Sequence, residues 1–310
     1  MKRSEKHIIV NLQKASAAFS FSFIFFMALF VACSTPTVSS DDSDENSLNQ
    51  FSSSGERVKS SSSEKPSESS SSLSEADCAA LLEGETEWRW DIPKDCRFNP
   101  DIDYGTMTDS RDGQVYRTVD IGGQTWMAEN LNYASSAKTP GLLGKSWCFD
   151  NDSEKCAVTG HLYTWAAAID SATLYDGGKG VNCGEGKTCR LPSKVRGLCP
   201  NGWHLPDTTE WNTLFTKVGG RNNAGKVLRS RTGWNDCEDG TDDYGFSVLP
   251  DGGRYDDGLY DFAGSAASIW STSQDGEMYA YIMDLSLCSK NVYLNISRKT
   301  NGHSVRCVKD

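Results

Sequence analysis

The chain has 310 residues, with 42 acidic side chains against 31 basic ones and a formal net charge of −11. This balance argues against binding to duplex nucleic acid, because proteins that bind it present clustered basic side chains to the phosphates. The eleven cysteines are more than a cytosolic enzyme usually carries, so the sequence indicates an oxidising compartment and structural disulfides.

Residues 1–32 are typical of a bacterial lipoprotein signal peptide. Four of the residues 2–14 are basic, and a largely apolar stretch follows over residues 15–32. Small residues directly before Cys33 resemble a lipobox, in which the cysteine becomes the new N-terminus and is acylated. We therefore expect Cys33 to anchor the chain by its lipids at the bacterial outer membrane or cell surface. The alternative is an uncleaved anchor helix, and both arrangements place residues 34–310 outside the cytoplasm.

Residues 33–76 are predicted to form a disordered tether that begins with the lipidated cysteine. Residues 34–74 contain 18 serines in 41 positions and almost no large apolar side chains. Such a segment cannot bury enough apolar surface to offset the entropy lost on ordering. A flexible coil of this length spans on the order of 35 Å, so we expect it to hold a folded domain away from a membrane.

Order is expected to resume in a small segment, residues 77–103. Cys78 and Cys96 bracket most of it, and a segment of this size has too little core to fold without a covalent link. We therefore predict a disulfide between these two cysteines. Residues 104–310 then form the main domain, which is long enough for one complete core.

The main domain is predicted to consist of short strands separated by glycine turns. The clearest hairpin joins residues 115–119 to residues 124–128 through a Gly122-Gly123 turn. Further strands are expected at residues 279–285, 292–296 and 304–308, the last after an Asn301-Gly302 turn.

Two helices are predicted within the same domain. Apolar residues at three- and four-residue spacing predict the first over residues 161–169. The second begins after Asp207, which serves as its N-cap with Glu210 three positions later in a capping-box pattern. It is expected to end at Gly219-Gly220.

Several motifs carry a family resemblance. They are CPNGWHLP at residues 199–206 with Glu210-Trp211, GGQTWMAENL at 122–131, SVLP at 247–250 and SVRCVKD at 304–310. By these motifs, residues 104–310 resemble the Fibrobacter succinogenes major paralogous domain (FISUMP) family. The resemblance implies a secreted or surface-attached bacterial domain and brings no established activity.

A more distant similarity is to the C-type-lectin-like fold used by formylglycine-generating and related proteins. It is carried by GWHLP at residues 202–206, by Glu210-Trp211 and by Val305-Arg306. It implies an α+β domain with a twisted antiparallel sheet, two main helices and long disulfide-stapled loops. A fold does not fix a function by itself.

Ten cysteines remain for disulfides after Cys33. Besides the link at the start of the domain, proximity along the chain suggests the pairs Cys148–Cys156 and Cys183–Cys189. The C-type-lectin-like resemblance implies a bridge from Cys199, before the long helix, to Cys307 in the last strand. Cys237 and Cys288 are then left for each other.

No catalytic motif stands out. Residues 186–188 match only the end of a P-loop, whose first glycine would stand where the chain has Val181. His204 lies between two apolar residues and is interpreted as a buried hydrogen-bonding group rather than a general base. Since every cysteine has a plausible partner, we expect no enzyme. Chemistry at Cys237 and Cys288 of the formylglycine-generating type is the least favoured alternative.

An acidic loop around Gly240 is a candidate calcium site. Calcium binds six to eight oxygen ligands on a tight turn, and this loop offers several carboxylates. The candidate ligands are Asp236, Glu238, Asp239 and Asp242, with Asp243 beside them. The spacing departs from an EF-hand, so a solvated acidic loop without metal is the alternative.

Aromatic residues of the last third offer a second candidate binding surface. Exposed flat rings stack on sugars, and tyrosines also suit protein interfaces because they are rigid and amphipathic. We expect Trp270 to lie in the core. Tyr255 and Tyr260 occupy a loop rich in glycine and aspartate, and are the residues expected to contact a ligand.

These features together predict a surface-anchored bacterial lipoprotein with a non-catalytic extracellular binding domain of the adhesion type. The expected partner is a polysaccharide or another surface protein. A structural component of the cell envelope is the first alternative, and an oxidative enzyme is the second.

Overall fold

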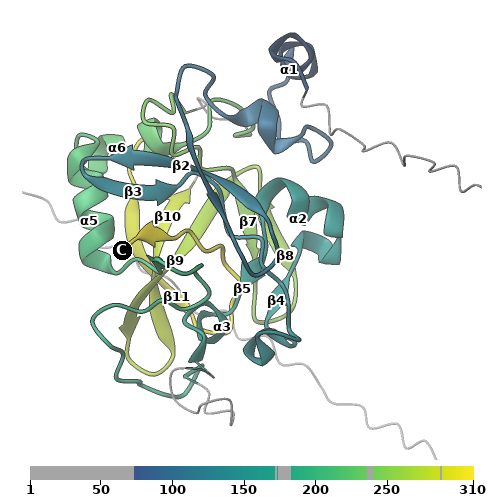
Figure 1. The fold of residues 1–310 in the computed structure, drawn as a ribbon. Helices are drawn as coiled ribbons and strands as arrows, with labels where there is room; N and C mark the ends of the chain where they lie inside the picture. Colours follow the sequence, from purple (N-terminus) through teal and green to yellow (C-terminus); the bar gives the residue numbers. More distant parts are fainter. Residues whose placement is uncertain (1–72, 172, 174–182, 236–239, 287) are drawn as a thin grey trace, which may run out of the picture. The chain divides into compact units, whose positions relative to one another are not determined.

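The computed structural model describes residues 73–171, 173, 183–235, 240–286 and 288–310. These residues belong to one compact unit, Glu68–Asp310, which has both helices and sheets (Figure 1). The α+β class expected from the sequence is therefore confirmed. The predicted signal peptide, Cys33 and nearly all of the tether lie outside the described residues.

The first five-stranded sheet has the order β1-β2-β3-β12-β6, with antiparallel pairing throughout. Its centre is the predicted hairpin, in which β2 (Val115–Ile121) pairs with β3 (Gln124–Met127). Gly122 and Gly123 have φ values of 61° and 89°, which is why glycine suits this two-residue turn. The other strands are β1 (Gly105–Thr108), β6 (Trp203–His204) and β12 (Val308–Lys309).

The second five-stranded sheet has the order β11-β10-β9-β7-β8. Its strands are β7 (Asp251–Arg254), β8 (Tyr260–Ala263), β9 (Ala266–Asp275), β10 (Tyr279–Ser286) and β11 (Tyr293–Arg298). All pairs are antiparallel except β7 with β9, which are parallel. The two strands predicted here match β10 and β11 closely, whereas residues 304–308 contribute only one isolated bridge, at Ser304, and the first residue of β12.

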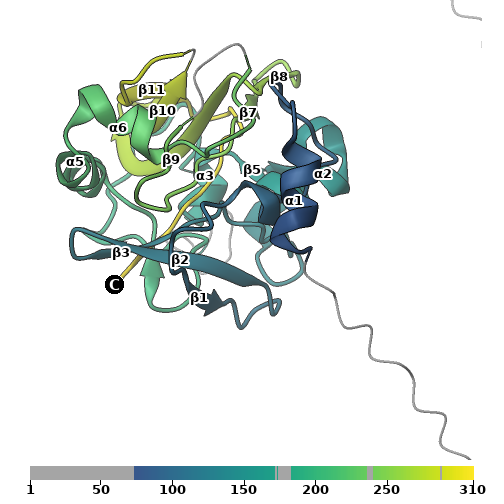
Figure 2. The ribbon, with the colours of Figure 1, turned by 90° about the horizontal axis from the view of Figure 1, so that it is seen from above.

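The long helix was predicted correctly as α5 (Thr208–Lys217), with the capping box between Asp207 and Glu210. It is followed by α6 (Arg221–Leu228), for which no prediction was made. In Figure 1 and Figure 2, α5 and α6 lie on the opposite side of the unit from α1 (Glu75–Leu82) and α2 (Ser153–Thr159).

The predicted helix over residues 161–169 is wrong in its first half. Residues Leu162–Tyr163 form β5, which pairs with β4 (Ser146–Trp147), and α3 spans only Trp165–Ala168. The backbone of Tyr163 exchanges two hydrogen bonds with His303, at 2.8 and 3.0 Å. This long-range pairing overrides the helical spacing of the apolar residues, because it satisfies the same backbone groups.

The apolar core has two parts, on opposite faces of β9 and β10. One part packs α5 and α6 against Ile269 and Met283, together with Trp126 of the first sheet. The other packs α3 against Trp270 and Ile282, so Trp270 is in the core as predicted.

Four disulfides join described cysteines, and they agree with the expected pairs. They are Cys78–Cys96, Cys148–Cys156, Cys183–Cys189 and Cys199–Cys307. Cys288 is also disulfide-bonded, and Cys237, its expected partner, lies outside the described residues. Within the described residues, no helix combines the length and apolar character needed to cross a membrane.

Candidate functional site

The two predicted ligand-contacting tyrosines lie beside the β7–β8 hairpin and face different neighbours. The half-buried Tyr260 places its ring 5.3 Å from that of Phe149 and donates a hydrogen bond to Asn151 Oδ1 at 2.9 Å. Tyr255 packs edge-on against Phe262 at 5.9 Å, and burial raises the pKa of its hydroxyl to about 12. Only Tyr260 therefore belongs to a larger aromatic surface.

That surface, which we call the aromatic strip, consists of Trp88, Trp90, Phe149 and Tyr260. Successive ring centroids are 5.1, 5.1 and 5.3 Å apart. The rings come from the segment after α1, from the short 3-10 helix Phe149–Asn151 and from β8, so only the folded chain brings them together. Phe149 is 7% exposed, and the other three are half-buried, which leaves part of each ring accessible to a ligand.

The distribution of tryptophan singles out the same region. Six of the nine tryptophans are buried: Trp126, Trp165, Trp203, Trp211, Trp234 and Trp270. The three half-buried tryptophans are Trp88, Trp90 and Trp147. Arg254 connects Trp147 to the strip, because its guanidinium lies 4.0 Å from the Trp147 ring centroid and 5.9 Å from that of Tyr260. Large amphipathic rings are typical of recognition surfaces, because they combine apolar contact area with a polar edge.

Cationic side chains also border the strip. The Lys155 ammonium lies 5.1 Å from the Trp90 ring centroid and 5.3 Å from that of Phe149, and it pairs with Asp150 at 2.5 Å. Such cations stabilise the rings electrostatically and place N–H donors beside their faces. The strip thus offers a ligand apolar faces and hydrogen-bond donors side by side.

The Cys148–Cys156 disulfide closes the loop that carries Phe149 and Lys155. His161 Nε2 lies 3.8 Å from Cys148 Sγ, and these three residues are the described group whose ligand atoms are close enough to hold a metal. Metal ligation needs free thiolates, whereas these sulfurs are joined to each other. We therefore interpret the Cys148–Cys156 disulfide as a covalent link that holds this loop of the aromatic strip in place. Burial lowers the pKa of His161 to about 4, so its ring is neutral near pH 7.

Three of the four predicted calcium ligands, Asp236, Glu238 and Asp239, lie outside the described residues, so the calcium site stays a prediction. The fourth, Asp242, is fully buried. Its carboxylate accepts hydrogen bonds from Ser247 N at 2.7 Å and from Ser247 Oγ at 2.6 Å. Burial raises its pKa to about 7. Asp242 therefore holds the turn before Ser247 together, which corrects the expectation that it faces solvent.

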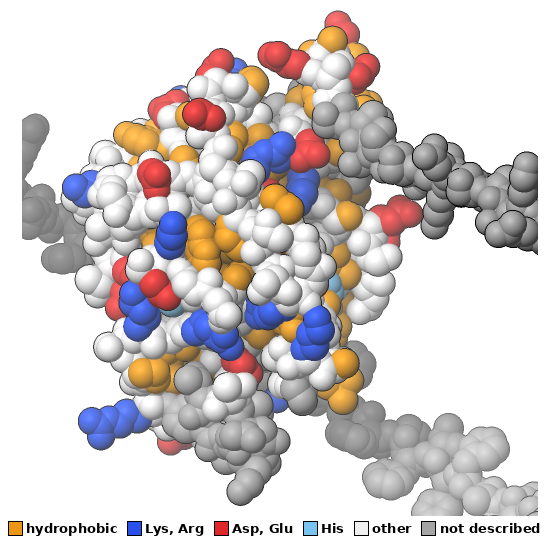
Figure 3. Space-filling view, in the orientation of Figure 1, with side chains coloured by type: hydrophobic (Ala, Val, Ile, Leu, Met, Phe, Trp, Pro, Cys, Tyr) orange, Lys and Arg blue, Asp and Glu red, His pale blue; other side chains and the backbone are white. Residues whose placement is uncertain are grey.

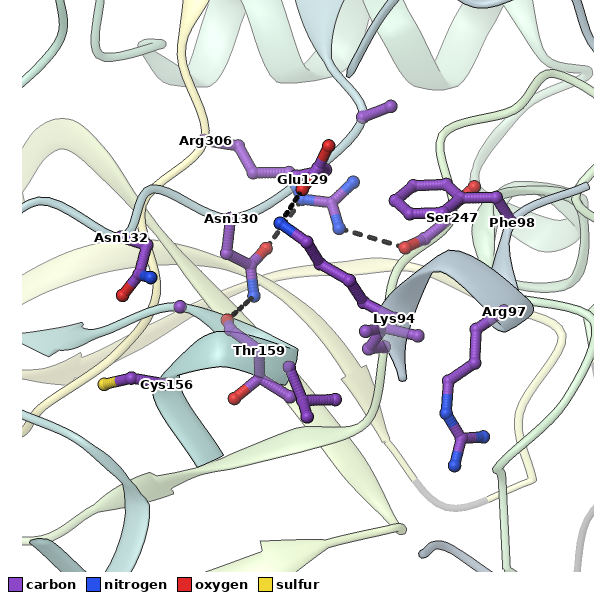
Figure 4. A pocket seen from close by; sticks show the side chains of 14 residues that line it. Lys94, Arg97, Phe98, Glu129, Asn130, Asn132, Cys156, Thr159, Ser247 and Arg306 are labelled. Atoms are coloured by element: carbon purple, nitrogen blue, oxygen red, sulfur yellow. Dashed lines mark hydrogen bonds and ion pairs between the residues drawn. The ribbon is translucent and has the colours of Figure 1, made fainter. Parts of the chain in front are cut away.

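A small pocket beneath the 3-10 helix Lys94–Arg97 contains a dense polar network (Figure 4). The Arg306 guanidinium donates to Asn130 Oδ1 at 2.7 Å and to the carbonyls of Phe246 and Ser247. In the same pocket, Lys94 pairs with Glu129. The cavity of about 20 Å³ has room for a single water molecule, so we interpret the network as structural rather than ligand-binding.

Two buried carboxyl groups, those of Asp242 and Asp251, lie near Arg306. Asp251 accepts hydrogen bonds from Ser304 Oγ and, at 2.8 Å, from Asn130 Nδ2. Burial raises the pKa of Asp251 to about 7 and lowers that of Arg306 to about 10, while each charge partly offsets the shift of the other. Besides the predicted core disulfide through Cys307, the terminal SVRCVKD motif therefore contributes a buried charge network that the sequence did not reveal. The available signal was an arginine set between the apolar residues Val305 and Cys307.

His204 behaves as its apolar neighbours predicted. It is 3% exposed, and its Nδ1 and Nε2 lie 2.8 Å from Asp310 Oδ1 and 2.7 Å from Glu210 Oε1. Burial opposes the charged form of the ring, but the two carboxylates outweigh it and raise the His204 pKa. The histidine links the last residue of the chain to the first turn of α5.

The sequence profile of the Fibrobacter succinogenes major domain matches residues 119–309. Neither a curated protein nor a solved structure is significantly similar to the chain. Phe149 and Tyr260 lie inside the matched region, whereas Trp88 and Trp90 precede it. The aromatic strip is therefore assembled from the matched domain and from the segment that comes before it.

Proposed function

Because the chain belongs to the Fibrobacter succinogenes major domain family, we propose that it is a surface-anchored bacterial lipoprotein whose folded domain binds extracellular polysaccharide without catalysing a reaction. The family supports a surface protein. The lipobox-like residues before Cys33 and the serine-rich tether support attachment at the outer membrane or cell surface. A C-type-lectin-like architecture remains part of this proposal, favoured by two sheets, two main helices and the bridge from Cys199 to Cys307.

The aromatic strip is the observation that carries the proposal. Sugar rings present C–H groups on their faces and hydroxyl groups at their edges. A half-exposed ring such as Trp90 or Tyr260 offers an apolar face to the former, and Lys155 and Arg254 place donors within reach of the latter. Several rings in contact offer more area than a single sugar covers, which suits a polymer.

A non-catalytic role is supported by where the perturbed titratable groups lie. Asp242, Asp251 and His303, whose pKa values shift most strongly among the described acids and histidines, are all enclosed in the interior. Catalytic groups with shifted pKa values normally line an accessible cleft.

A surface protein is the second candidate partner, and the edge strand β11 favours it. Among the described residues, β11 pairs on one side only, and Tyr293 and Ile296 are 39% and 47% exposed. An open edge with apolar side chains can accept a strand from another protein.

The proposal is tested with the full chain, purified in mild detergent, on an array of neutral and acidic polysaccharides with and without EDTA. We expect retention on at least one polysaccharide, and we expect Trp90→Ala and Tyr260→Ala to abolish it. Tyr293→Ala is the matched control, since it removes an exposed tyrosine from the opposite edge of the same sheet. Absence of retention on every polysaccharide, or wild-type retention by Tyr260→Ala, would contradict the proposal. Loss of retention in EDTA would add a calcium site to it.

A further inference from the structure

A groove of about 530 Å³ lies between α1 and the body of the domain. This volume is in the range of ligand-binding pockets. Its walls are largely apolar and include Leu73, which is 44% exposed, with Leu82 from α1 and Ile102 from the body. Figure 1 shows α1 at the periphery, away from both sheets.

Helix α1 is held beside this groove without burying any side chain of its own. It has eight residues, and a helix of this length is marginal in water unless other interactions stabilise it. Here the stabilisation comes from the capping box between Ser74 and Asp77 and from the Cys78–Cys96 disulfide. The helix therefore forms a fixed wall whose apolar side chains remain available to a ligand.

The floor of the groove is a stack of aromatic rings and an arginine. Phe98 and Tyr104 meet edge to face at 5.5 Å, and the Arg117 guanidinium lies 4.0 Å from the Phe98 ring centroid. The Tyr104 hydroxyl is hydrogen-bonded to Ser247 Oγ at 3.0 Å, which fixes its ring. The floor thus presents an oriented guanidinium beside flat apolar surface.

Two arginines of the groove are bound to carboxylates that are themselves exposed. Arg117, 32% exposed, pairs with Asp95 at 2.7 Å, and Arg231, 45% exposed, pairs with Asp101 at 3.2 Å. Asp95 and Asp101 are 52% and 81% exposed, and exposed pairs of this kind contribute little stability. In both pairs the donor is Nη1, and a guanidinium carries five N–H groups. A carboxylate from a ligand can therefore replace or join these aspartates at low cost.

A buried arginine, Arg97, links the groove to the aromatic strip. Arg97 lines the groove, and its guanidinium lies 4.3 Å from the ring centroid of Trp88, the first ring of the strip. Figure 3 shows basic side chains among acidic ones on one face of the domain, although the chain is acidic as a whole. In the groove itself, Arg117 and Arg231 are the cations that a negatively charged polymer would meet.

We propose that this groove binds a carboxylate-bearing sugar, so that the polysaccharide recognised by the domain is an acidic one. The inference rests on the proposed function and specifies its ligand class. The carboxylate lies on Arg117 and Arg231, where planar guanidinium groups suit it better than an ammonium would. The apolar face of the sugar lies against the aromatic floor and α1, and the polymer continues along the strip.

The test compares a galacturonic acid hexamer with its carboxyl-reduced galactose counterpart, by calorimetric titration of the full chain. We expect the acidic hexamer to bind about tenfold more tightly, since a hydrogen bond to a charged group is worth more than a neutral one. We expect Arg231→Gln and Arg117→Gln to reduce the affinity for the acidic hexamer to that of the neutral one. Arg196→Gln is the matched control, because Arg196 is an exposed arginine that does not line the groove.

The outcomes separate this inference from the function on which it rests. Equal affinity for the two hexamers, or an unchanged acidic preference in Arg231→Gln, would overturn the inference and leave polysaccharide binding standing. Binding of a glutamate hexamer as tightly as the galacturonic acid hexamer would overturn the sugar assignment in favour of an acidic peptide. Failure of every polysaccharide on the array would remove the proposed function itself.

Discussion

Removing the disulfide between Cys199 and Cys307 is expected to lower the free energy of unfolding by about 5 kcal/mol. The two cysteines are 108 positions apart, and the chain-entropy relation for a closed loop of that length gives this value. For Cys148 and Cys156, only 8 positions apart, the same relation gives about 2.5 kcal/mol. Since whole domains are stable by about 5–15 kcal/mol, the longer link accounts for a large share of stability.

The assay is equilibrium unfolding in urea of the wild type and of two double variants, Cys199→Ala with Cys307→Ala and Cys148→Ala with Cys156→Ala. Both sulfurs of the longer link are fully buried in the core, so cavity formation adds to its entropic cost. The first double variant must therefore be the less stable of the two. Equal stability of the two double variants, or a smaller loss for the longer link, would refute the reasoning.

Three further predictions concern the interior. Arg306→Met is expected to lower the free energy of unfolding by about 3–5 kcal/mol in the same urea assay, because buried acceptors and carboxyl groups lose their partner. A decrease below about 1 kcal/mol would show that the network is not needed. Burial raises the folded-state pKa of Asp242 from 3.8 to about 7, so its contribution to stability is fully present below pH 4 and is lost as the pH rises through 7. Asp242→Asn should therefore flatten the pH dependence of the free energy of unfolding between pH 4 and 7, by at most about 4 kcal/mol. An unchanged slope would contradict this. Gly197→Ala should lower the free energy of unfolding by about 1–3 kcal/mol, because Gly197 has a φ of 56° and a Cβ there would lie 2.3 Å from the Ala168 carbonyl oxygen. A melting temperature equal to that of the wild type would show that the backbone adapts.

The elements that could be predicted from the sequence are those with local signals. The hairpin of β2 and β3 depends on a Gly-Gly turn between segments in which apolar and polar residues alternate, and α5 depends on a capping box. Each signal therefore lies within a few consecutive residues. By contrast, β9 was not predicted, although it is the longest described strand. Its burial on both faces removes the alternation that identifies a strand.

The candidate site was only partly predictable for the same reason. Tyr260 was singled out by its loop, but its partners Trp90 and Phe149 come from distant parts of the chain. Asp242 was misplaced because its acidic neighbours suggested a solvated loop, whereas the two donors that bury it come from Ser247, five positions later. Local composition indicates exposure on average and cannot identify a carboxylate that turns inward, as that of Asp242 does.

The central claim, that the aromatic strip is the polysaccharide-binding surface, is tested most directly by oxidative footprinting of the nine tryptophans with and without a retained polysaccharide. Without ligand, the half-buried Trp88, Trp90 and Trp147 should be oxidised faster than the six buried ones, which serve as internal references. The account predicts that the polysaccharide protects Trp88 and Trp90. Oxidation of these two at an unchanged rate, under conditions in which the polysaccharide is bound, would contradict it.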